Sequence, residues 1–359
     1  MPDMDILRRA AEKNRVPFLK SSLALMAILA VSFCGTRAFA QNPPQNPPPI
    51  KVQQIPPPPD AVQKKGNAYT LKKNVDMVRL PVSIVDNKGN FVPGLEEDNF
   101  RILENNNPQK ISAFTHEDIP VTVGLVIDNS GSMRSKRARV NEAAMDFIKT
   151  SNPQDQSFVV NFNDEFYLDM DQDFTNDPKI LKAALERIDS RGGTALYDAI
   201  LGSMGHLEKG TREKKVLLVV TDGEDHDSTH RDLSYLVQKL QESSVEIYAV
   251  GLFTKGDDSR GEVREGTRAL EAIARASGGE AFFPKTMDDV DSVCLRIAQD
   301  IRAQYTIGYY PSDAARDGTF RTLKVELVGV KHHGKLSVRA RPGYYAPKAG
   351  ANEAVTGSK

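Results

Sequence analysis

Cysteine is scarce in this chain, and so is net charge of either sign. Only two cysteines, Cys34 and Cys294, occur among 359 residues, which excludes a disulfide-stapled scaffold and a cysteine-based zinc cluster. The 47 Lys and Arg residues are matched by 48 Asp and Glu residues, so the formal net charge is −1. Without a net basic field the surface as a whole does not attract nucleic acid, and no nucleic-acid partner is expected.

The apolar run near the N-terminus is too short to span a membrane. Residues 21–33 are uncharged, follow a basic start and precede Ala38-Phe39-Ala40. As a helix this run rises only about 20 Å, whereas the hydrocarbon core of a bilayer is about 30 Å thick. A basic flank, a short apolar core and a small-residue site are typical of a secretory signal peptide. We predict cleavage after Ala40 and a secreted or periplasmic mature chain without a membrane span; an uncleaved anchor is the alternative.

The mature chain contains segments that differ in composition and in hydrophobic pattern. Residues 41–66 begin with nine of the 21 prolines and are predicted to form an extended linker. Residues 67–119 and 303–346 show short alternating apolar patterns, with strands expected at 78–85, 100–103, 305–310, 322–327 and 335–340. Neither flank has enough strands to be stable alone, so together they are predicted to form one small β-sandwich. Residues 347–359 are a tail.

Residues 120–302 have a different hydrophobic pattern, in which continuous apolar runs alternate with helical stretches. Strands are expected at 121–127, 157–162, 215–220, 245–250 and 281–283, and helices at 137–149, 179–188, 195–208, 232–241, 268–276 and 289–302. Continuous apolar strands alternating with helices indicate a mostly parallel sheet that is covered on both faces. The predicted fold class is therefore α/β, a doubly wound Rossmann-like domain inserted into the β-sandwich.

Three loops of this inserted domain carry oxygen ligands. The first strand runs into Asp128-Asn129-Ser130-Gly131-Ser132, and the strand at 215–220 runs into Thr221-Asp222-Gly223. Between them, Arg191-Gly192-Gly193-Thr194 opens a helix. Ligands of open α/β sheets bind beyond the carboxyl ends of the strands, so these loops are expected to meet there. The predicted metal ligands are Asp128, Ser130, Ser132, Thr194 and Asp222.

This donor set contains only oxygen, which suits a hard cation: Mg²⁺ first, with Mn²⁺ or Ca²⁺ as alternatives. Two carboxylates only balance a divalent ion formally. If both act partly through water, the ion remains electrophilic, and a carboxylate from another molecule can complete its coordination shell. Each loop taken singly is more typical of a turn or a helix cap, because Asp, Ser and Gly favour both positions. Their order along the chain, each at the end of the appropriate element, favours a metal site.

Other chemistry-bearing residues are predicted to have ordinary roles. Asp198 is either a residue supporting the metal ligands or a solvated helix acid. His226 and His230 are expected to be exposed in a loop, and Cys294 to be a small core residue. No Ser/His/Asp or Cys/His set stands out.

The five predicted ligand residues match a sequence pattern of a known family. Residues 120–302 resemble a von Willebrand factor type A (VWA) domain, whose metal-ion-dependent adhesion site reads DxSxS, then Thr, then Asp. The resemblance implies that Ser130, Ser132 and Thr194 reach the ion directly or through water, and that Asp128 and Asp222 act mainly through water. The flanking stretches resemble the bacterial secreted group called VWFA-related.

These observations predict a secreted, metal-dependent binding module that engages a protein ligand presenting a carboxylate. Two alternatives remain: a structural subunit of a cell-envelope complex, and a metal-dependent hydrolase, for which no general base is evident. The oligomeric state is left open.

Overall fold

The computed structural model describes residues 76–348 except for 117, 188–189, 224, 230–231, 254–259 and 331–333. The predicted signal peptide, the proline-rich linker, most of the predicted tail and His230 lie outside the described residues. In the part of the chain that is described, no helix combines the length and apolar character needed to cross a bilayer.

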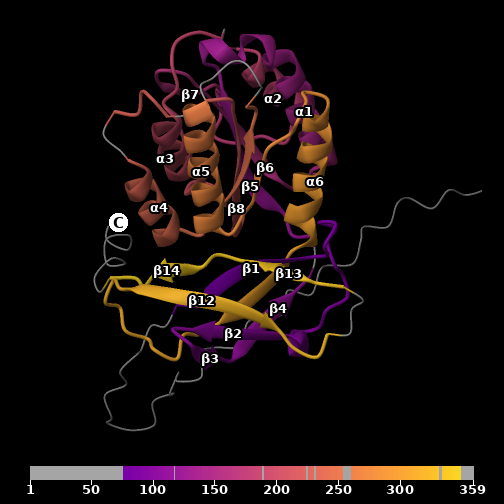
Figure 1. The fold of residues 1–359 in the computed structure, drawn as a ribbon, viewed down its shortest axis with the longest axis vertical. Helices are drawn as coiled ribbons and strands as arrows, with labels where there is room; N and C mark the ends of the chain where they lie inside the picture. Colours follow the sequence, from indigo (N-terminus) through magenta and orange to yellow (C-terminus); the bar gives the residue numbers. More distant parts are fainter. Residues whose placement is uncertain are drawn as a thin grey trace, which may run out of the picture. The chain divides into compact units, whose positions relative to one another are not determined.

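A six-stranded sheet forms the centre of the α/β domain (Figure 1). Its strand order is β10-β9-β8-β5-β6-β7. Its strands are β5 (Val121–Asp128), β6 (Gln156–Phe162), β7 (Phe166–Leu168), β8 (Lys214–Thr221), β9 (Val245–Gly251) and β10 (Ala281–Phe282). All are parallel except β7, which pairs antiparallel with β6. Every residue of β5 and β9 is buried, because helices cover both faces of the sheet.

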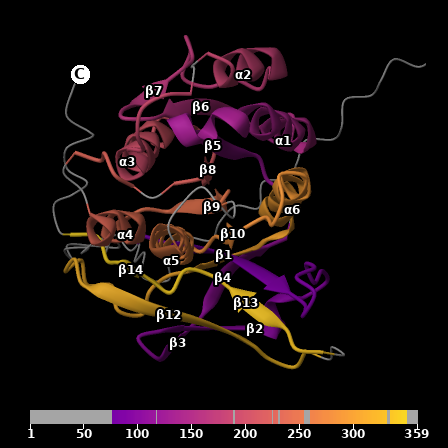
Figure 2. The ribbon, with the colours of Figure 1, turned by 45° about the horizontal axis from the view of Figure 1, so that its top comes forward.

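Helices lie on both sides of this sheet. They are α1 (Arg137–Thr150), α2 (Pro178–Leu185), α3 (Leu196–Leu207), α4 (Leu233–Glu242), α5 (Arg260–Ser277) and α6 (Asp289–Ala303). Figure 2 shows α1 and α6 on one face and α3, α4 and α5 on the other. The doubly wound fold predicted from the sequence is confirmed. Because β5 lies between β6 and β8, the winding of the chain reverses beside β5, which is where such folds bind ligands.

The flanks of the α/β domain form two four-stranded sheets, in the orders β13-β1-β11-β4 and β14-β12-β2-β3. The strands are β1 (Val78–Val85), β2 (Phe100–Glu104), β3 (Asn107–Gln109), β4 (Ile111–Thr115), β11 (Tyr305–Tyr309), β12 (Phe320–Leu327), β13 (Ser337–Arg339) and β14 (Gly343–Tyr345). β1 pairs antiparallel with β11, and β2 with β12. Each sheet therefore joins strands from both sides of the inserted domain, as the split-sandwich prediction requires.

Several elements differ from the sequence-based expectation. The strands β3, β4, β7 and β14 were not predicted, and α5 begins at Arg260 rather than Arg268. All three residues of β7 are exposed, so this strand has no alternating apolar pattern to reveal it. The early turns of α5 contain Gly261 and Gly266, which favour loop by propensity. Here tertiary packing of α5 against β9 and α4 overrides local propensity.

Cys294 lies in α6 and is buried in the core of the α/β domain, as predicted. Burial raises the pKa of its thiol to about 12. The thiol is therefore protonated at neutral pH and is not a nucleophile.

Candidate metal centre

Asp128 ends β5, and its side chain is fully buried against β8. The hydroxyl of Thr221 donates to Asp128 Oδ2 at 2.6 Å, and the main-chain N–H of Ser130 donates to Oδ1 at 2.7 Å. Burial raises the pKa of this carboxyl to about 6, although both hydrogen bonds act in the opposite direction. The carboxylate is thus held firmly, but its negative charge lacks solvation.

The hydroxyls of Ser130 and Ser132 connect this loop to the one that follows β8. Their Oγ atoms are 3.0 Å apart, and Ser132 Oγ donates to Asp222 Oδ1 at 2.8 Å. Ser130 and Asp222 are each only 2% exposed. Side-chain oxygens that are ninety positions apart in sequence therefore converge at the carboxyl end of the sheet.

Thr194 approaches from the third loop. A Cβ atom placed on Gly223 would lie 3.3 Å from Thr194 Oγ1, so this hydroxyl lies beside the residue that follows Asp222. The main-chain N–H of Thr194 donates to Asp227 Oδ2 at 2.7 Å. The structure links Asp128, Ser130, Ser132 and Asp222 through a chain of hydrogen bonds and places Thr194 next to them.

Main-chain hydrogen bonds tie the loops together. The N–H of Gly131 donates to Gly192 O at 3.1 Å, and the N–H of Arg191 donates to Asn129 O at 2.9 Å. Gly192 has φ +73°, a left-handed conformation that favours glycine. The loop before α3 is therefore fixed against the Asp128 loop independently of any bound ion.

A sequence model of the von Willebrand factor type A domain matches residues 122–296. This segment is a VWA domain. A solved structure of a von Willebrand factor type A protein from Catenulispora acidiphila is 16% identical, covers 77% of this chain and 74% of that one, and has a TM-score of 0.45. The vWF domain of the type V pili tip protein Mfa5 from Porphyromonas gingivalis is 14% identical, with 51% and 95% covered and a TM-score of 0.43.

One curated relative, an uncharacterised protein from Synechocystis, is 24% identical over 167 residues. That match covers 46% of this chain and 38% of the relative, so the chain spans well under half the length of that protein. The narrower VWFA-related grouping stays a prediction.

Gly192→Ala is expected to lower the free energy of unfolding by about 1–3 kcal/mol, because a side chain is strained at this positive φ. Its Cβ would also clash with Asp164 Oδ2. Gly131→Ala is the matched control, since its Cβ would meet only Gly192 O, at 3.7 Å. Thermal denaturation of both variants measures the difference. Equal losses for both would contradict this account of the loop.

Three residues around the candidate ligands were given no role by the sequence. Thr221 orients Asp128, and Asp227 holds the main chain at Thr194. Lys136 Nζ lies 2.6 Å from Asp222 Oδ2, and this pair is almost entirely buried. A sequence signal existed only for Thr221, which directly precedes Asp222; the other two contacts depend on tertiary placement.

The acids near α3 support the loop at 225–229. Asp225 Oδ1 accepts from the N–H of Tyr197 at 3.0 Å, and Asp198 Oδ2 accepts from the N–H of Thr229 at 2.8 Å. His226 is exposed, as predicted. Among the described residues, no three His, Cys, Asp or Glu side chains gather closely enough to hold a metal ion by themselves.

The chemistry of the five side chains nevertheless fits a hard divalent cation. The VWA domain offers two carboxylates and three hydroxyls, with no nitrogen or sulfur donor among them. Mg²⁺ prefers such oxygen ligands and usually keeps several waters, so it needs few charged protein groups. The buried Asp128 carboxylate would also gain a bound cation in place of the solvation that burial removes.

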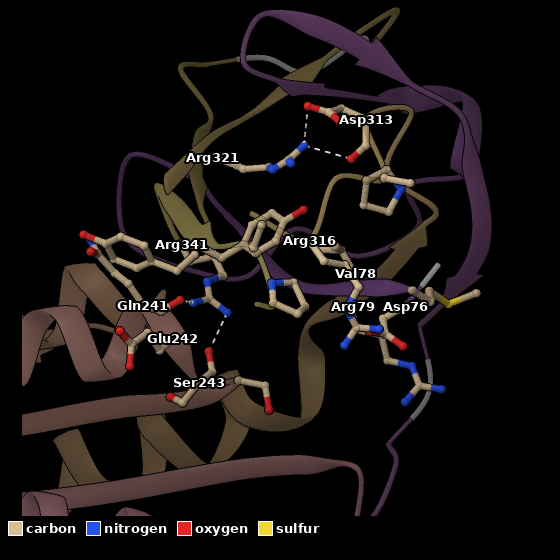
Figure 3. Close-up of a pocket in the computed structure, with 18 of the residues that line it drawn as sticks. Asp76, Val78, Arg79, Gln241, Glu242, Ser243, Asp313, Arg316, Arg321 and Arg341 are labelled. Carbon is tan, nitrogen blue, oxygen red and sulfur yellow. Dashed lines mark hydrogen bonds and ion pairs between the residues drawn. The ribbon is translucent and has the colours of Figure 1, made fainter. Parts of the chain in front are cut away.

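A pocket of about 420 Å³ lies elsewhere, between the sandwich and the C-terminal end of α4 (Figure 3). Its arginines are already engaged: Arg341 donates to Gln241 O at 2.9 Å and to Ser243 O at 2.8 Å. Arg321 Nη1 contacts Asp313 Oδ2 at 3.0 Å. The bonds of Arg341 join the sandwich to the VWA domain, and we assign the pocket no part in the metal centre.

Proposed function

We propose that the protein is a binding module that acts outside the cytoplasm and engages a partner protein through a divalent cation. Asp128, Ser130, Ser132, Thr194 and Asp222 would hold the ion, Mg²⁺ in the first instance. When bound, the ion would supply an electrophilic centre, and a carboxylate of the partner would complete its coordination shell. The residues of this chain supply the oxygen ligands and keep the loops fixed.

One observation supports this proposal above all. The Ser130–Ser132–Asp222 hydrogen-bond chain joins two loops at the carboxyl end of the sheet, beside the fully buried Asp128. Buried carboxylates without solvation are costly unless a cation or a hydrogen bond compensates them. The known chemistry of Mg²⁺ matches this all-oxygen arrangement.

Capture of partners from an envelope fraction tests the proposal. A chain beginning at Gln41 is immobilised and exposed to the fraction with Mg²⁺ or with EDTA, alongside an Asp222→Ala variant. We expect a captured protein that is lost with EDTA and with Asp222→Ala. Asp146→Ala is the control, because Asp146 is an exposed acid paired with Lys149 on the outside of α1.

Two other outcomes separate the alternative functions. Equal capture with Mg²⁺ and with EDTA would contradict the metal-dependent binding module. A collapse of the melting temperature on removal of metal, without any change in capture, would instead support a structural subunit of an envelope complex. Metal-dependent turnover of a substrate would support a hydrolase.

A further inference from the structure

Lys136 is an unusual residue to find at the candidate metal centre. It lies between the short 3₁₀ helix Gly131–Ser135 and α1, and its ammonium is 2.6 Å from Asp222 Oδ2. The side chains are 6% exposed for Lys136 and fully buried for Asp222. Lysine is almost never buried unless it is paired, because desolvating its charge is expensive.

The charges around the site can be counted from the contacts. Asp128 and Asp222 contribute two negative charges, and Lys136 contributes one positive charge by direct contact with Asp222. Arg137 is also close, but its guanidinium donates to Leu185 O and interacts with Asp169 as well as Asp128. Within the described structure, Lys136 is therefore the cation that contacts a candidate ligand carboxylate directly.

Resting on the proposed function, we infer that Lys136 sets the charge of the metal centre so that its preferred ligand carries one carboxylate. Asp128, Asp222 and Lys136 together carry one net negative charge, so a bound divalent ion would leave one positive charge. One carboxylate of the partner neutralises this remainder. Without Lys136 the two aspartates would neutralise the ion, and a partner carboxylate would have no net charge to compensate.

The same charge has a second consequence. An ammonium a few ångströms away repels a divalent cation, so Lys136 weakens metal binding in the free protein. A bound carboxylate offsets that repulsion. Metal and carboxylate should therefore each strengthen the binding of the other, because coupling between two sites is reciprocal.

Titration with Mn²⁺ alone, followed by electron paramagnetic resonance, tests the inference. The variants are Lys136→Met, which removes the charge at similar length, and Lys136→Arg, which keeps it. Lys136→Met is expected to bind Mn²⁺ at least about tenfold more tightly than the native chain, and Lys136→Arg about as tightly as native. A merely structural role for Lys136 would weaken metal binding in both.

The coupling is tested with sodium acetate as a minimal carboxylate, against sodium chloride at equal ionic strength. After correction for acetate binding to free Mn²⁺, acetate should tighten Mn²⁺ binding to the native chain and not to Lys136→Met. If Lys136→Met folds poorly, Lys136→Gln provides the same test. If the native chain binds Mn²⁺ and neither Lys136→Met nor Lys136→Gln binds it more tightly, the inference about Lys136 is overturned, but the proposed metal centre is not. Failure of the native chain to bind Mn²⁺ would overturn both.

Discussion

Asp128→Asn is expected to weaken Mg²⁺ or Mn²⁺ binding by at least about 100-fold. Outer-shell partners of metal sites alone contribute 10–100-fold to affinity, and Asp128 supplies one of two negative charges at this site. The variant keeps the size of the side chain and one carbonyl oxygen. Thr221 can rotate its hydroxyl to accept from the new amide, so the loop should retain its conformation.

The same variant should leave the metal-free protein at least as stable as the native chain. Asp128 is fully buried, and the burial that raises its pKa to about 6 also disfavours its charge in the metal-free fold. Calorimetric titration with MgCl₂ and thermal denaturation in EDTA measure the two effects. Asp198→Asn is the control, because Asp198 binds the loop at Thr229 instead of the candidate ligands. Native-like metal affinity in Asp128→Asn would exclude this residue from the site.

Arg321→Met is expected to lower the free energy of unfolding of the β-sandwich by about 3–5 kcal/mol, since it breaks a buried ion pair. Arg321 is 1% exposed, and its Nη1 lies 3.3 Å from Glu104 Oε1. Glu104 also accepts hydrogen bonds from the hydroxyls of Tyr309, at 2.7 Å, and Tyr344, at 2.8 Å. Removing the guanidinium leaves a buried carboxylate with two neutral donors and, among the residues that the structure describes, no direct cationic partner.

Urea denaturation followed by tyrosine fluorescence measures this loss, because the chain contains no tryptophan. Arg101→Met is the matched control: Arg101 pairs with Glu326 at 3.8 Å on the same pair of strands, but it is exposed. Its loss should be below about 1 kcal/mol. Adding Glu104→Gln to Arg321→Met should recover part of the stability. Equal losses for Arg321→Met and Arg101→Met would show that the buried pair contributes little.

The α/β domain was predictable because its sheet strands are buried on both faces. Such strands are continuous apolar runs, and residues 121–127 and 245–250 stand out in the sequence for that reason. β7 was not predictable, since Phe166–Leu168 is short and exposed, and its position depends on pairing with β6. α5 was only partly predictable, because two glycines weaken the helical signal of its early turns.

The closeness of the candidate ligand residues could also be predicted from the sequence, for a topological reason. Parallel strands place their carboxyl ends at one edge of the sheet, so polar residues that directly follow two adjacent strands lie close together. This argument reaches Asp128, Ser130, Ser132 and Asp222. It does not reach Asp227, which holds Thr194 through a loop contact whose geometry no local pattern encodes.

By itself, the amino-acid sequence determined the alternation of strands and helices, the loops that bear oxygen ligands and the division into an inserted domain with β flanks. Hydrophobic periodicity and the succession of elements along the chain depend on neighbouring residues, so both can be recognised in the sequence. Only the tertiary structure decided that Lys136 faces Asp222 and that Arg321 meets Glu104. Pairs of opposite charge that are 86 and 217 positions apart become partners only when packing removes both from water.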